Sequence, residues 1–509
     1  MKTAFATDPQ TIDPRKNADI FSSYFQKMIF EGLTRLAEHG NVEMALAKTV
    51  SLSDDGLVYR FSLRDAVWSD GTPITAYDFE YTWKQVLDPA FGAPCAFLFY
   101  PILNAPEALK REVSLDQLGI RAIDAKTFEV RLSHPTPYFL SLISFCPFFA
   151  IPKHIDEKNP NWAAQAQGVE FVCSGPYQLA EWKHNSKFVV KKNPLYWEKK
   201  QVFLEGVEVF IVSNEKTVLS MFENGEIDLI NSLTTPLSTD ELIHLKQSDS
   251  MNLFPNGSTS FCTFNLTHPL LQNPKIRKAL SLAINRSSIV RHITQMDEEP
   301  AKRFVPTTVV ATNKALTLMA PYDTALAKKL FAEGMQELKN KGIAADELLS
   351  KLTFSYESKE LTRRVAQAIQ QEWKQVLGFK VELQENDFKT LLGNLERKNY
   401  AAALFYWAAH YLDPMSILDR FKFRSASKNY PGYENQEYIS LLTQAQNTND
   451  TALRIQLMES AEAVIVNDMP LAPIYHFNQV LLKNKRFNDV AVTPLGDVVF
   501  RNVKPVPAL

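Results

Sequence analysis

The histidine at position 410 stands at the end of a stretch whose composition otherwise indicates a buried strand. Residues 404–417 read LFYWAAHYLDPMSI: apolar and aromatic residues come first, then His410, and the run breaks at Asp413-Pro414. In open α/β sheets, ligands bind beyond the carboxyl ends of the strands. An imidazole there can meet a carboxylate or bind a metal ion. A surface or hydrogen-bonded loop histidine is the alternative interpretation.

The chain contains none of the short motifs that mark common catalytic or nucleotide-binding sites. HExxH, GxSxG, GxxxxGK[ST] and GxGxxG do not occur, and the nine histidines include no pair at metal-ligand spacing on one helix. No local pattern supports a cysteine–histidine nucleophile pair. An enzyme of 509 residues normally shows some such arrangement, so the sequence favours binding over catalysis, without a metal or a cofactor.

The four cysteines are far apart in the sequence and form no CxxC pair, which argues against metal clusters and thioredoxin-like redox chemistry. We expect them to be buried free thiols, with one or two disulfides as the alternative. They are Cys95, Cys146, Cys173 and Cys262.

The clearest folding unit lies directly before His410, at residues 359–407. Its first part has the apolar spacing of a helix, and Gly378 can end that helix. Residues 379–383 then alternate as a strand. The helix would bury Leu361, Val365, Ile369, Trp373 and Val376 or Leu377.

A second helix and a second strand complete this unit. Asn386 or Asp387 can cap the helix, which carries Phe388 and three leucines. Residues 401–407 follow as a strand with apolar residues on both faces, which indicates parallel pairing. His410 therefore falls three residues past the carboxyl end of a buried strand, where a ligand site is expected.

The composition of the whole chain is that of a multi-domain globular protein. Its 509 residues are 45% hydrophobic and 22% charged, with a net charge of −2, so we expect two or three mixed α/β domains. No basic block is long enough to indicate nucleic acid or an anionic membrane as a partner. No apolar run reaches the roughly 18 residues that a membrane span needs.

Many segments, in the same order, resemble the extracytoplasmic oligopeptide-binding proteins that serve ABC importers, the family-5 solute-binding proteins. The most specific are WSDGTPITAYDFEYTWKQVLDP (68–89) and FENGEIDLI (222–230). The others are TIDP…FEGLTRL (11–36), LSDDGLVYRFSLR (52–64), VRLSHPTPYFLSLIS (130–144), SGPYQLAEW (174–182), KKNPLYWE (191–198), FNLTHPLLQNPKIRKALSLAINR (264–286) and the YWAAHYLDP region. The resemblance covers nearly the whole chain.

The resemblance implies an α/β, two-lobed periplasmic-binding-protein fold (type II, cluster C) with an extra subdomain inserted in the first lobe. Lobe 1 would comprise residues 1–44, 172–264 and 478–509, and the inserted subdomain residues 45–171. Residues 265–477 would form lobe 2. Two crossover strands would serve as a hinge, and the lobes would close on the ligand.

The resemblance also implies a monomeric receptor that delivers peptides or peptide-like compounds to the membrane subunits of an ABC permease. The receptor would be periplasmic or otherwise extracytoplasmic, with or without a lipid anchor. Residues 1–14, MKTAFATDPQTIDP, contain no long apolar segment, so an export signal would have been removed or left out. The peptide would lie extended in an inter-lobe cleft and pair its backbone with strand edges, while hydrated pockets accept many side chains.

The family's ligand-binding positions can be carried over onto this sequence. One backbone edge would be formed by Tyr406, Trp407 and Ala408. The facing edge would be formed by Ala18, Asp19 and Ile20. Further ligand-binding residues would be Phe388, His410, Tyr411 and, near the lobe junction, Tyr475 and His476.

The sequence departs from the family's pattern at the position that matters most for peptide recognition. The peptide binders read roughly W-x-x-D-x-x-[DE]-P, and that first Asp grips the free amino terminus of the peptide; here His410 takes its place. Leu404 stands where some of them have an Arg for the ligand's carboxylate. An ammonium–carboxylate bond is worth roughly 1.5–3 kcal/mol. A protonated histidine would repel the amine, and a neutral one is a weaker acceptor.

Three hypotheses follow for the ligand's leading end. Asp19 could take the amine in place of the missing carboxylate. Alternatively, the amine is left to water or is blocked, and His410 meets a carboxylate, as in a cell-wall-derived peptide or another acidic ligand. The third hypothesis is a metal chelate bound by His410, with or without His476. The rival functional classes are a peptidase or amidase and a module that docks partner proteins.

Overall fold

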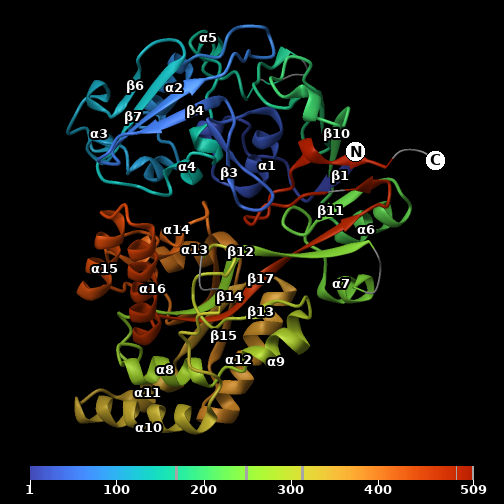
Figure 1. Cartoon of the computed structure of the whole chain (residues 1–509). Helices are drawn as coiled ribbons and strands as arrows, with labels where there is room; N and C mark the ends of the chain where they lie inside the picture. Colours follow the sequence, from blue (N-terminus) through green and yellow to red (C-terminus); the bar gives the residue numbers. More distant parts are fainter. Residues whose placement is uncertain (165, 167–169, 247–249, 311–314, 489, 507–509) are drawn as a thin grey trace. The chain divides into compact units, whose positions relative to one another are not determined.

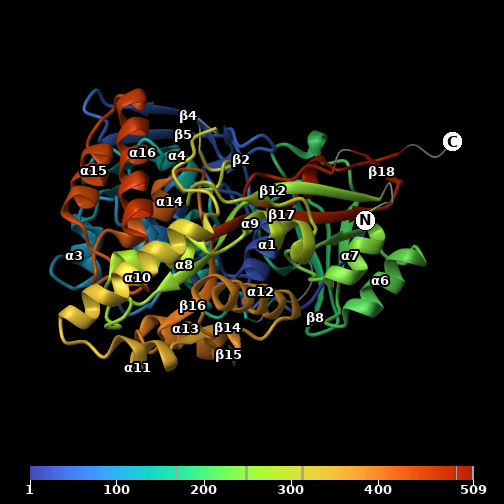
Figure 2. The same ribbon diagram turned by 90° about the horizontal axis from the view of Figure 1, so that it is seen from below.

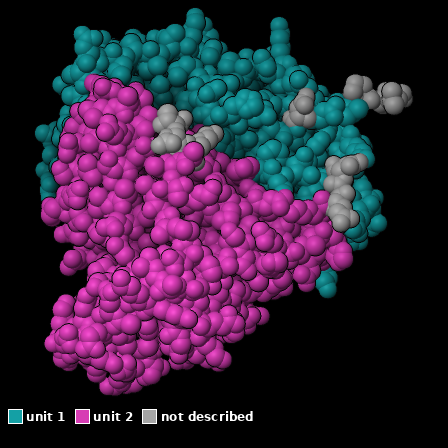
Figure 3. All heavy atoms as spheres, turned by 60° about the horizontal axis from the view of Figure 1, so that its bottom comes forward, with its two compact units in different colours: residues 1–237, 247–254, 479–509 teal, residues 238–246, 255–478 magenta. Residues whose placement is uncertain are grey.

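The structure is a computed structural model that describes residues 1–164, 166, 170–246, 250–310, 315–488 and 490–506. The chain divides into two compact units (Figure 3). Unit 1 comprises residues 1–237, 247–254 and 479–509, and unit 2 comprises residues 238–246 and 255–478. The division into two lobes and an inserted subdomain, with the boundaries expected above, stays a prediction.

Unit 1 contains a mixed sheet, of which β1, β10 and β11 are labelled in Figure 1. In the order β11–β1–β10–β9–β8, β1 pairs in parallel with β10 and β11, and β9 pairs antiparallel with both β10 and β8. The strands are β1 (Lys2–Phe5), β8 (Tyr177–Lys183), β9 (Lys187–Lys192), β10 (Gly206–Ile211) and β11 (Leu229–Asn231). The helices α1 (Ile20–Ile29) and α6 (Glu215–Glu223) belong to the same unit.

A second, four-stranded antiparallel sheet of unit 1 has the order β4–β5–β7–β6. Trp83 of α2 is fully buried beside it: its indole packs edge-on against Phe99, Phe128 and Phe148, and its Nε1 donates to the carbonyl of Phe148 (2.9 Å). The elements are β4 (Ala47–Leu52), β5 (Val58–Leu63), β6 (Ile120–Ala122), β7 (Thr127–Arg131), α2 (Ala76–Val86), α3 (Ala105–Leu109), α4 (Phe139–Leu142) and α5 (Lys153–Asp156). Two-stranded ladders are formed by β2 (Thr34–Leu36) with β3 (Val42–Met44) and by β18 (Phe487–Asn488) with β19 (Lys504–Pro505).

The sheet of unit 2 has the order β15–β14–β16–β12–β17. The helices α12 and α13 pack against β14, and α10 runs along α8 (Figure 2). The strands are β12 (Met251–Phe264), β13 (Glu299–Pro300), β14 (Thr353–Glu357), β15 (Glu382–Asn386), β16 (Ala402–Ala408) and β17 (Leu471–Lys483). The helices are α7 (Thr239–Leu245), α8 (Pro274–Leu282), α9 (Arg286–Ile289), α10 (Thr324–Asn340), α11 (Ala345–Ser350), α12 (Glu360–Leu377), α13 (Phe388–Glu396), α14 (Met415–Leu418), α15 (Gln436–Gln446) and α16 (Thr451–Asp468).

Two long neighbouring strands each contribute residues to both units. β12 enters unit 2 at Pro255, and β17 leaves it after Asn478. A strand is continuous through its hydrogen-bonded ladder, so these crossings are regular structure rather than loose linkers. The mixed α/β fold with two compact units and two crossing strands confirms the fold class expected from the sequence.

The helices of the 359–407 unit form where the sequence predicts them. α12 buries Val365, Ile369 and Trp373, and it ends at Gly378, whose φ of 81° suits a residue without a side chain. The carboxylate of Asp387 accepts from the backbone N–H of Thr390 and caps α13.

The strands of this unit differ from the prediction in three ways. β15 begins at Glu382, three residues later than predicted, and Phe379 and Val381 are buried ahead of the ladder. β14 was not predicted; it lies between β15 and β16 and pairs in parallel with both, so those two strands are not direct neighbours. β16 is buried only as far as Phe405, and Tyr406 and Ala408 are exposed.

Candidate functional site

One edge of β16 is unpaired over its last three residues. β12 pairs antiparallel with the whole strand, from Ala402 to Ala408. On the other side β14 pairs in parallel only at Ala402 and Ala403 and then diverges. In the part of the chain that the structure describes, no strand covers Tyr406–Ala408 on that side. An uncovered strand edge is a template for another extended chain.

The direction of each main-chain group on this edge follows from the antiparallel ladder. The N–H of Ala409 donates to the carbonyl of Gly257 (2.9 Å), so the odd-numbered residues turn their N–H and C=O groups toward β12. The even-numbered residues turn theirs the opposite way. Tyr406 therefore offers an N–H and a C=O at the open edge, and Ala408 offers an N–H. The carbonyl of Ala408 accepts from Arg420 Nη2 (3.3 Å).

Aromatic rings follow one another along this end of the strand. Phe388 of α13 stacks on Phe405 (6.4 Å between ring centroids), which stacks on Tyr406 (5.6 Å). Tyr406 meets Phe477 of β17 edge-on at 5.9 Å. Phe388 and Tyr406 are 43% and 40% exposed, which is high for large apolar side chains. These rings form an apolar wall beside the open edge.

A cation packs on the indole of Trp407. The guanidinium carbon of Arg420 lies 4.0 Å from the ring centroid, which is cation–π geometry. Tyr430 also stacks against this indole, at 5.3 Å and an interplanar angle of 16°. Trp407 Nε1 and the Tyr430 hydroxyl are both buried, and neither makes a hydrogen bond with a described residue. Arg420 and Tyr430 lie on later segments, and nothing in the local sequence pattern marked either of them.

His410 lies two residues past the end of β16, one closer than the sequence predicted. Its backbone N–H donates to Ser416 Oγ (2.7 Å). Burial, together with the nearby cations Arg420 and Lys428, lowers the pKa of His410 to about 3, so its imidazole is neutral at pH 7. The neighbouring Tyr411 is buried. At the position where the resemblance implied a carboxylate, the structure therefore has an uncharged ring.

A buried ion pair fixes the loop that carries His410. The two carboxylate oxygens of Asp413 accept from Arg454 Nη1 and Nη2 at 2.7 and 2.8 Å, a bidentate pair. Asp413 also accepts from the backbone N–H of Met415 (2.9 Å). With both residues buried, the pair holds the turn at Asp413-Pro414 in one geometry.

Tyr475 and His476, predicted near the lobe junction, lie on β17 in unit 2 and are buried. His476 Nδ1 is 2.8 Å from Thr259 Oγ1 on β12. Burial and Arg303 lower the pKa of His476 to about 3, so it too is neutral. Tyr475 packs edge-on against Phe477, which in turn meets Tyr406. Because Tyr475 and His476 are buried, they are weaker candidates for direct contact with a ligand than the residues of the exposed edge of β16.

Ala18, Asp19 and Ile20 lie in unit 1, at the start of α1. Asp19 caps that helix: its carboxylate accepts from the backbone N–H of Ser22 (2.9 Å) and from the Ser22 hydroxyl (2.6 Å). Ala18 and Ile20 are exposed, and the backbone of Ala18 makes no hydrogen bond with a described residue. The part of these residues in ligand binding stays a prediction, and Asp19 already serves as a cap.

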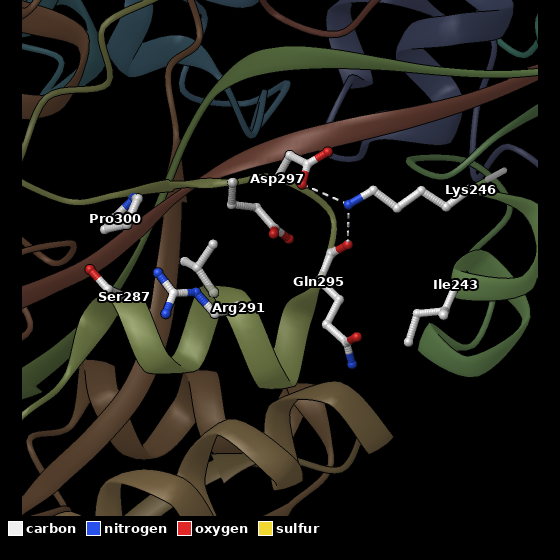
Figure 4. Close-up of a pocket in the computed structure, with 9 residues that line it drawn as sticks. Ile243, Lys246, Ser287, Arg291, Gln295, Asp297 and Pro300 are labelled. Atoms are coloured by element: carbon white, nitrogen blue, oxygen red, sulfur yellow. Dashed lines mark hydrogen bonds and ion pairs between the residues drawn. The ribbon is translucent and has the colours of Figure 1, made fainter.

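A separate pocket of unit 2, with a volume of about 520 Å³, lies between α7 and the chain around a π-helical turn at Val290–Thr294 (Figure 4). Lys246 spans it to Asp297 (2.6 Å) and to the carbonyl of Gln295 (2.9 Å). Asn478, where β17 leaves the unit, donates to the carbonyls of Met296 and Asp297 (2.9 Å each). These polar groups form hydrogen bonds with one another, and the segments that carry them are far in sequence from Tyr406–His410.

The structure also bears on the cysteines, on metal binding and on membrane insertion. All four cysteines are buried and unpaired, as the first interpretation of the sequence held. Among the described residues, no three or more His, Cys, Asp or Glu side chains are grouped as a metal site would need. No described helix has the length and apolar character of a bilayer span. The metal-chelate hypothesis for His410 and His476 therefore gains no support.

Comparisons with known proteins agree with this architecture. Residues 41–429 match the family described as bacterial extracellular solute-binding proteins, family 5. The oligopeptide-binding protein OppA of Bacillus subtilis is 34% identical, covering 97% of this chain and 91% of that protein. The crystal structure of a periplasmic oligopeptide-binding protein, OppAIV of Borrelia burgdorferi, superposes with a TM-score of 0.83 at 30% identity, over 99% of both chains.

One solved relative carries a ligand in its description. It is Listeria monocytogenes OppA bound to peptide, with a TM-score of 0.80 and 27% identity, covering 100% of this chain and 99% of that one. The family match spans most of the chain, and the relatives match it from end to end. This chain belongs to the bacterial extracellular solute-binding proteins of family 5.

Proposed function

We propose that this chain is the peptide-binding component of an ABC importer and that it binds an extended peptide by strand addition at β16. The observation that carries the proposal is the open edge at Tyr406–Ala408, where main-chain groups of alternate residues have no strand partner among the described residues. A peptide backbone that adds there gains hydrogen bonds that do not depend on its side chains. The matches to oligopeptide-binding proteins, one of them bound to peptide, support it.

From the same features we infer a low selectivity for the sequence of the peptide. Phe388 and Tyr406 present exposed apolar rings beside the edge rather than a closely fitted polar pocket, and the buried Phe405 supports both. Ring faces accept many apolar side chains by burial alone, at about 25 cal/mol per Å². We infer a binder of peptides or peptide-like compounds that passes its ligand on to a permease without changing it, outside the cytoplasm as the family description states.

A backbone methylation series tests strand addition directly. Each amide of a bound model peptide is N-methylated in turn, and affinities are measured by isothermal titration calorimetry. Because a strand presents alternate N–H groups to its neighbour, methylation should weaken binding about tenfold at every second amide and little at the amides between. The amides in between are the matched controls. Equal losses along the whole peptide would contradict pairing with β16.

The rival class, a peptidase or amidase, is tested with the same peptides. The protein is incubated with a mixed pool, and the pool is analysed by mass spectrometry before and after. We expect intact peptides that co-purify with the protein. Time-dependent fragments that disappear when the protein is omitted would establish catalysis instead.

A further inference from the structure

The guanidinium of Arg420 is only partly satisfied by the chain. Its Nε donates to the carbonyl of Ser416 (2.9 Å) and its Nη2 makes a long bond to the carbonyl of Ala408 (3.3 Å), while Nη1 has no hydrogen-bond partner among the described residues. Two buried arginines, Arg277 and Arg286, form no ion pair with a described carboxylate either, but all three nitrogens of each donate to oxygens of the chain.

The positive charge of Arg420 also lacks a counter-ion. No carboxylate of a described residue lies within ion-pair distance of it, although Asp419 is close enough to act on it electrostatically. The buried Arg15, Arg303 and Arg454, by contrast, each pair with at least one carboxylate. Arg420 is only partly buried, so water reaches part of its charge; packed on an aromatic ring and without a carboxylate in ion-pair contact, its guanidinium is accessible to an anionic ligand.

Two further donors gather around the same indole. Trp407 Nε1 and the Tyr430 hydroxyl are buried without a hydrogen-bond partner among the described residues, and each such donor costs about 1–3 kcal/mol if it stays unsatisfied. Tyr430 stacks on the Trp407 ring and Arg420 packs on it, so three donor groups share one neighbourhood at the end of β16. A ligand group with several hydrogen-bond acceptors, such as a carboxylate, could accept from these three donor groups.

The neighbouring groups include one exposed carboxylate, Asp419, which acts on Arg420 electrostatically without an ion-pair contact to it. His410 is uncharged, and Lys428 forms an ion pair with Glu396 (2.8 Å). An ammonium group here would face the guanidinium of Arg420, whereas a carboxylate would find that charge and the two donors on Trp407 and Tyr430. The sign of the site is therefore opposite to the one that a free peptide amine requires.

We propose that the end of β16 binds a carboxylate at the leading end of the ligand, with Arg420 as its counter-ion and Trp407 Nε1 and the Tyr430 hydroxyl as further donors. The ligands are then peptides whose amino end is acylated by a diacid or whose first side chain is acidic. This inference rests on the proposed function, because it names the chemical class of peptide that the same edge takes.

Matched ligands test the charge. Tri-alanine is prepared with a free amine, an acetyl, a succinyl or a succinamyl group, and Glu-Ala-Ala is added; affinities for the full chain are measured by calorimetry. Succinyl and succinamyl differ only in a carboxylate against an amide. We expect the succinyl peptide to bind at least about tenfold tighter than the succinamyl one. If Glu-Ala-Ala matches the succinyl peptide, the carboxylate belongs to a side chain; if it does not, the carboxylate belongs to an acyl group.

Matched variants test the residue. Arg420→Gln should abolish the succinyl preference, measured within the variant as the ratio of its affinities for the succinyl and succinamyl peptides. Arg424→Gln removes the same charge from an exposed arginine nearby and should leave the preference intact. Trp407→Phe keeps the ring but removes the Nε1 donor, and it should reduce the preference without abolishing it. Thermal unfolding of each variant confirms that it is folded.

The outcomes separate this inference from the function it rests on. If all the peptides bind and the succinyl group gives no advantage, or if Arg420→Gln leaves the advantage unchanged, the carboxylate site is wrong while peptide binding stands. If none of the peptides binds, both proposals are wrong.

Discussion

Two arginines that contact the segment after β16 differ in whether a carboxylate of the chain forms an ion pair with them. Arg454 is buried in a bidentate pair with Asp413, and the pair fixes the turn at Asp413-Pro414. Arg420 packs on Trp407, donates to two carbonyls and forms no ion pair with a described residue. A charge that the chain neutralises by itself contributes to the fold, whereas a charge left without a counter-ion is available to a ligand.

The largest expected effect separates these two roles through stability. Arg454→Met would leave the buried carboxylate of Asp413 unpaired, and removal of one partner of such a pair costs about 3–5 kcal/mol of unfolding free energy. Arg420→Met should change that free energy by less than about 1 kcal/mol, because no buried carboxylate is left behind. Urea unfolding measures both.

The double variant Arg454→Met with Asp413→Asn is the control for this prediction, because it removes the uncompensated charge. It should recover part of the lost stability. An Arg454→Met protein as stable as the wild type would show that the pair does not hold the turn.

Acid should destabilise the protein through its two neutral histidines. The folded pKa values of His410 and His476 are about 3, against an ordinary value of 6.5, so the unfolded state takes up protons first as the pH falls. Stability present above pH 6.5 is therefore lost progressively between pH 6.5 and 3, by at most about 1.4 kcal/mol per pH unit for each histidine.

Single His410→Gln and His476→Gln variants make this prediction specific. Chemical unfolding at pH 7, 6 and 5 should show a shallower loss of stability in each variant than in the wild type. Identical slopes in wild type and variant would mean that the histidine concerned has the same pKa in the folded and unfolded states.

The cation–π contact should have a smaller but measurable energy. A double-mutant cycle with Arg420→Gln and Trp407→Leu isolates the coupling between the two side chains, which we expect to be about 0.5–2 kcal/mol. Urea unfolding of the four proteins provides the cycle. A coupling near zero would mean that the indole does not orient Arg420.

The smallest expected effect concerns Asp19. As an N-cap, it should be replaced by Asn at almost no cost to stability and by Ala at about 1 kcal/mol, measured by urea unfolding. Measured by calorimetry, the Asp19→Asn substitution should change the affinities for free-amine and acetylated peptides by the same factor. A selective loss for the free-amine peptides would instead revive Asp19 as the amine anchor and count against the carboxylate at Arg420.

The features that the sequence predicted correctly are those that residues close together in the chain determine. The spacing of Val365, Ile369 and Trp373 defines α12, Gly378 supplies the positive φ at its end, and Asp387 caps the next helix. β14 escaped prediction because its five residues lack a clear pattern, and its position between β15 and β16 depends on pairing between distant segments.

The candidate site was predicted in its contiguous part and at Phe388, which came from the family resemblance and which the structure stacks on Phe405. Tyr406, Trp407 and His410 follow from one stretch of chain and from the resemblance of that stretch to a family motif. Arg420 and Tyr430 reach the same indole through the turns that follow, and no periodicity or motif relates them to it. Likewise, the neutral state of His410 depends on burial and on two cations brought near by the fold.

Amide hydrogen exchange, followed residue by residue by NMR, tests the central claim most directly. The N–H groups of Tyr406 and Ala408 point to the open edge, whereas those of Phe405 and Trp407 are already bonded to β12. With saturating peptide, exchange at Tyr406 and Ala408 should slow at least about tenfold, and exchange at Phe405 and Trp407 should change little. Unchanged exchange at Tyr406 and Ala408, with peptide bound, would show that the ligand does not pair with β16.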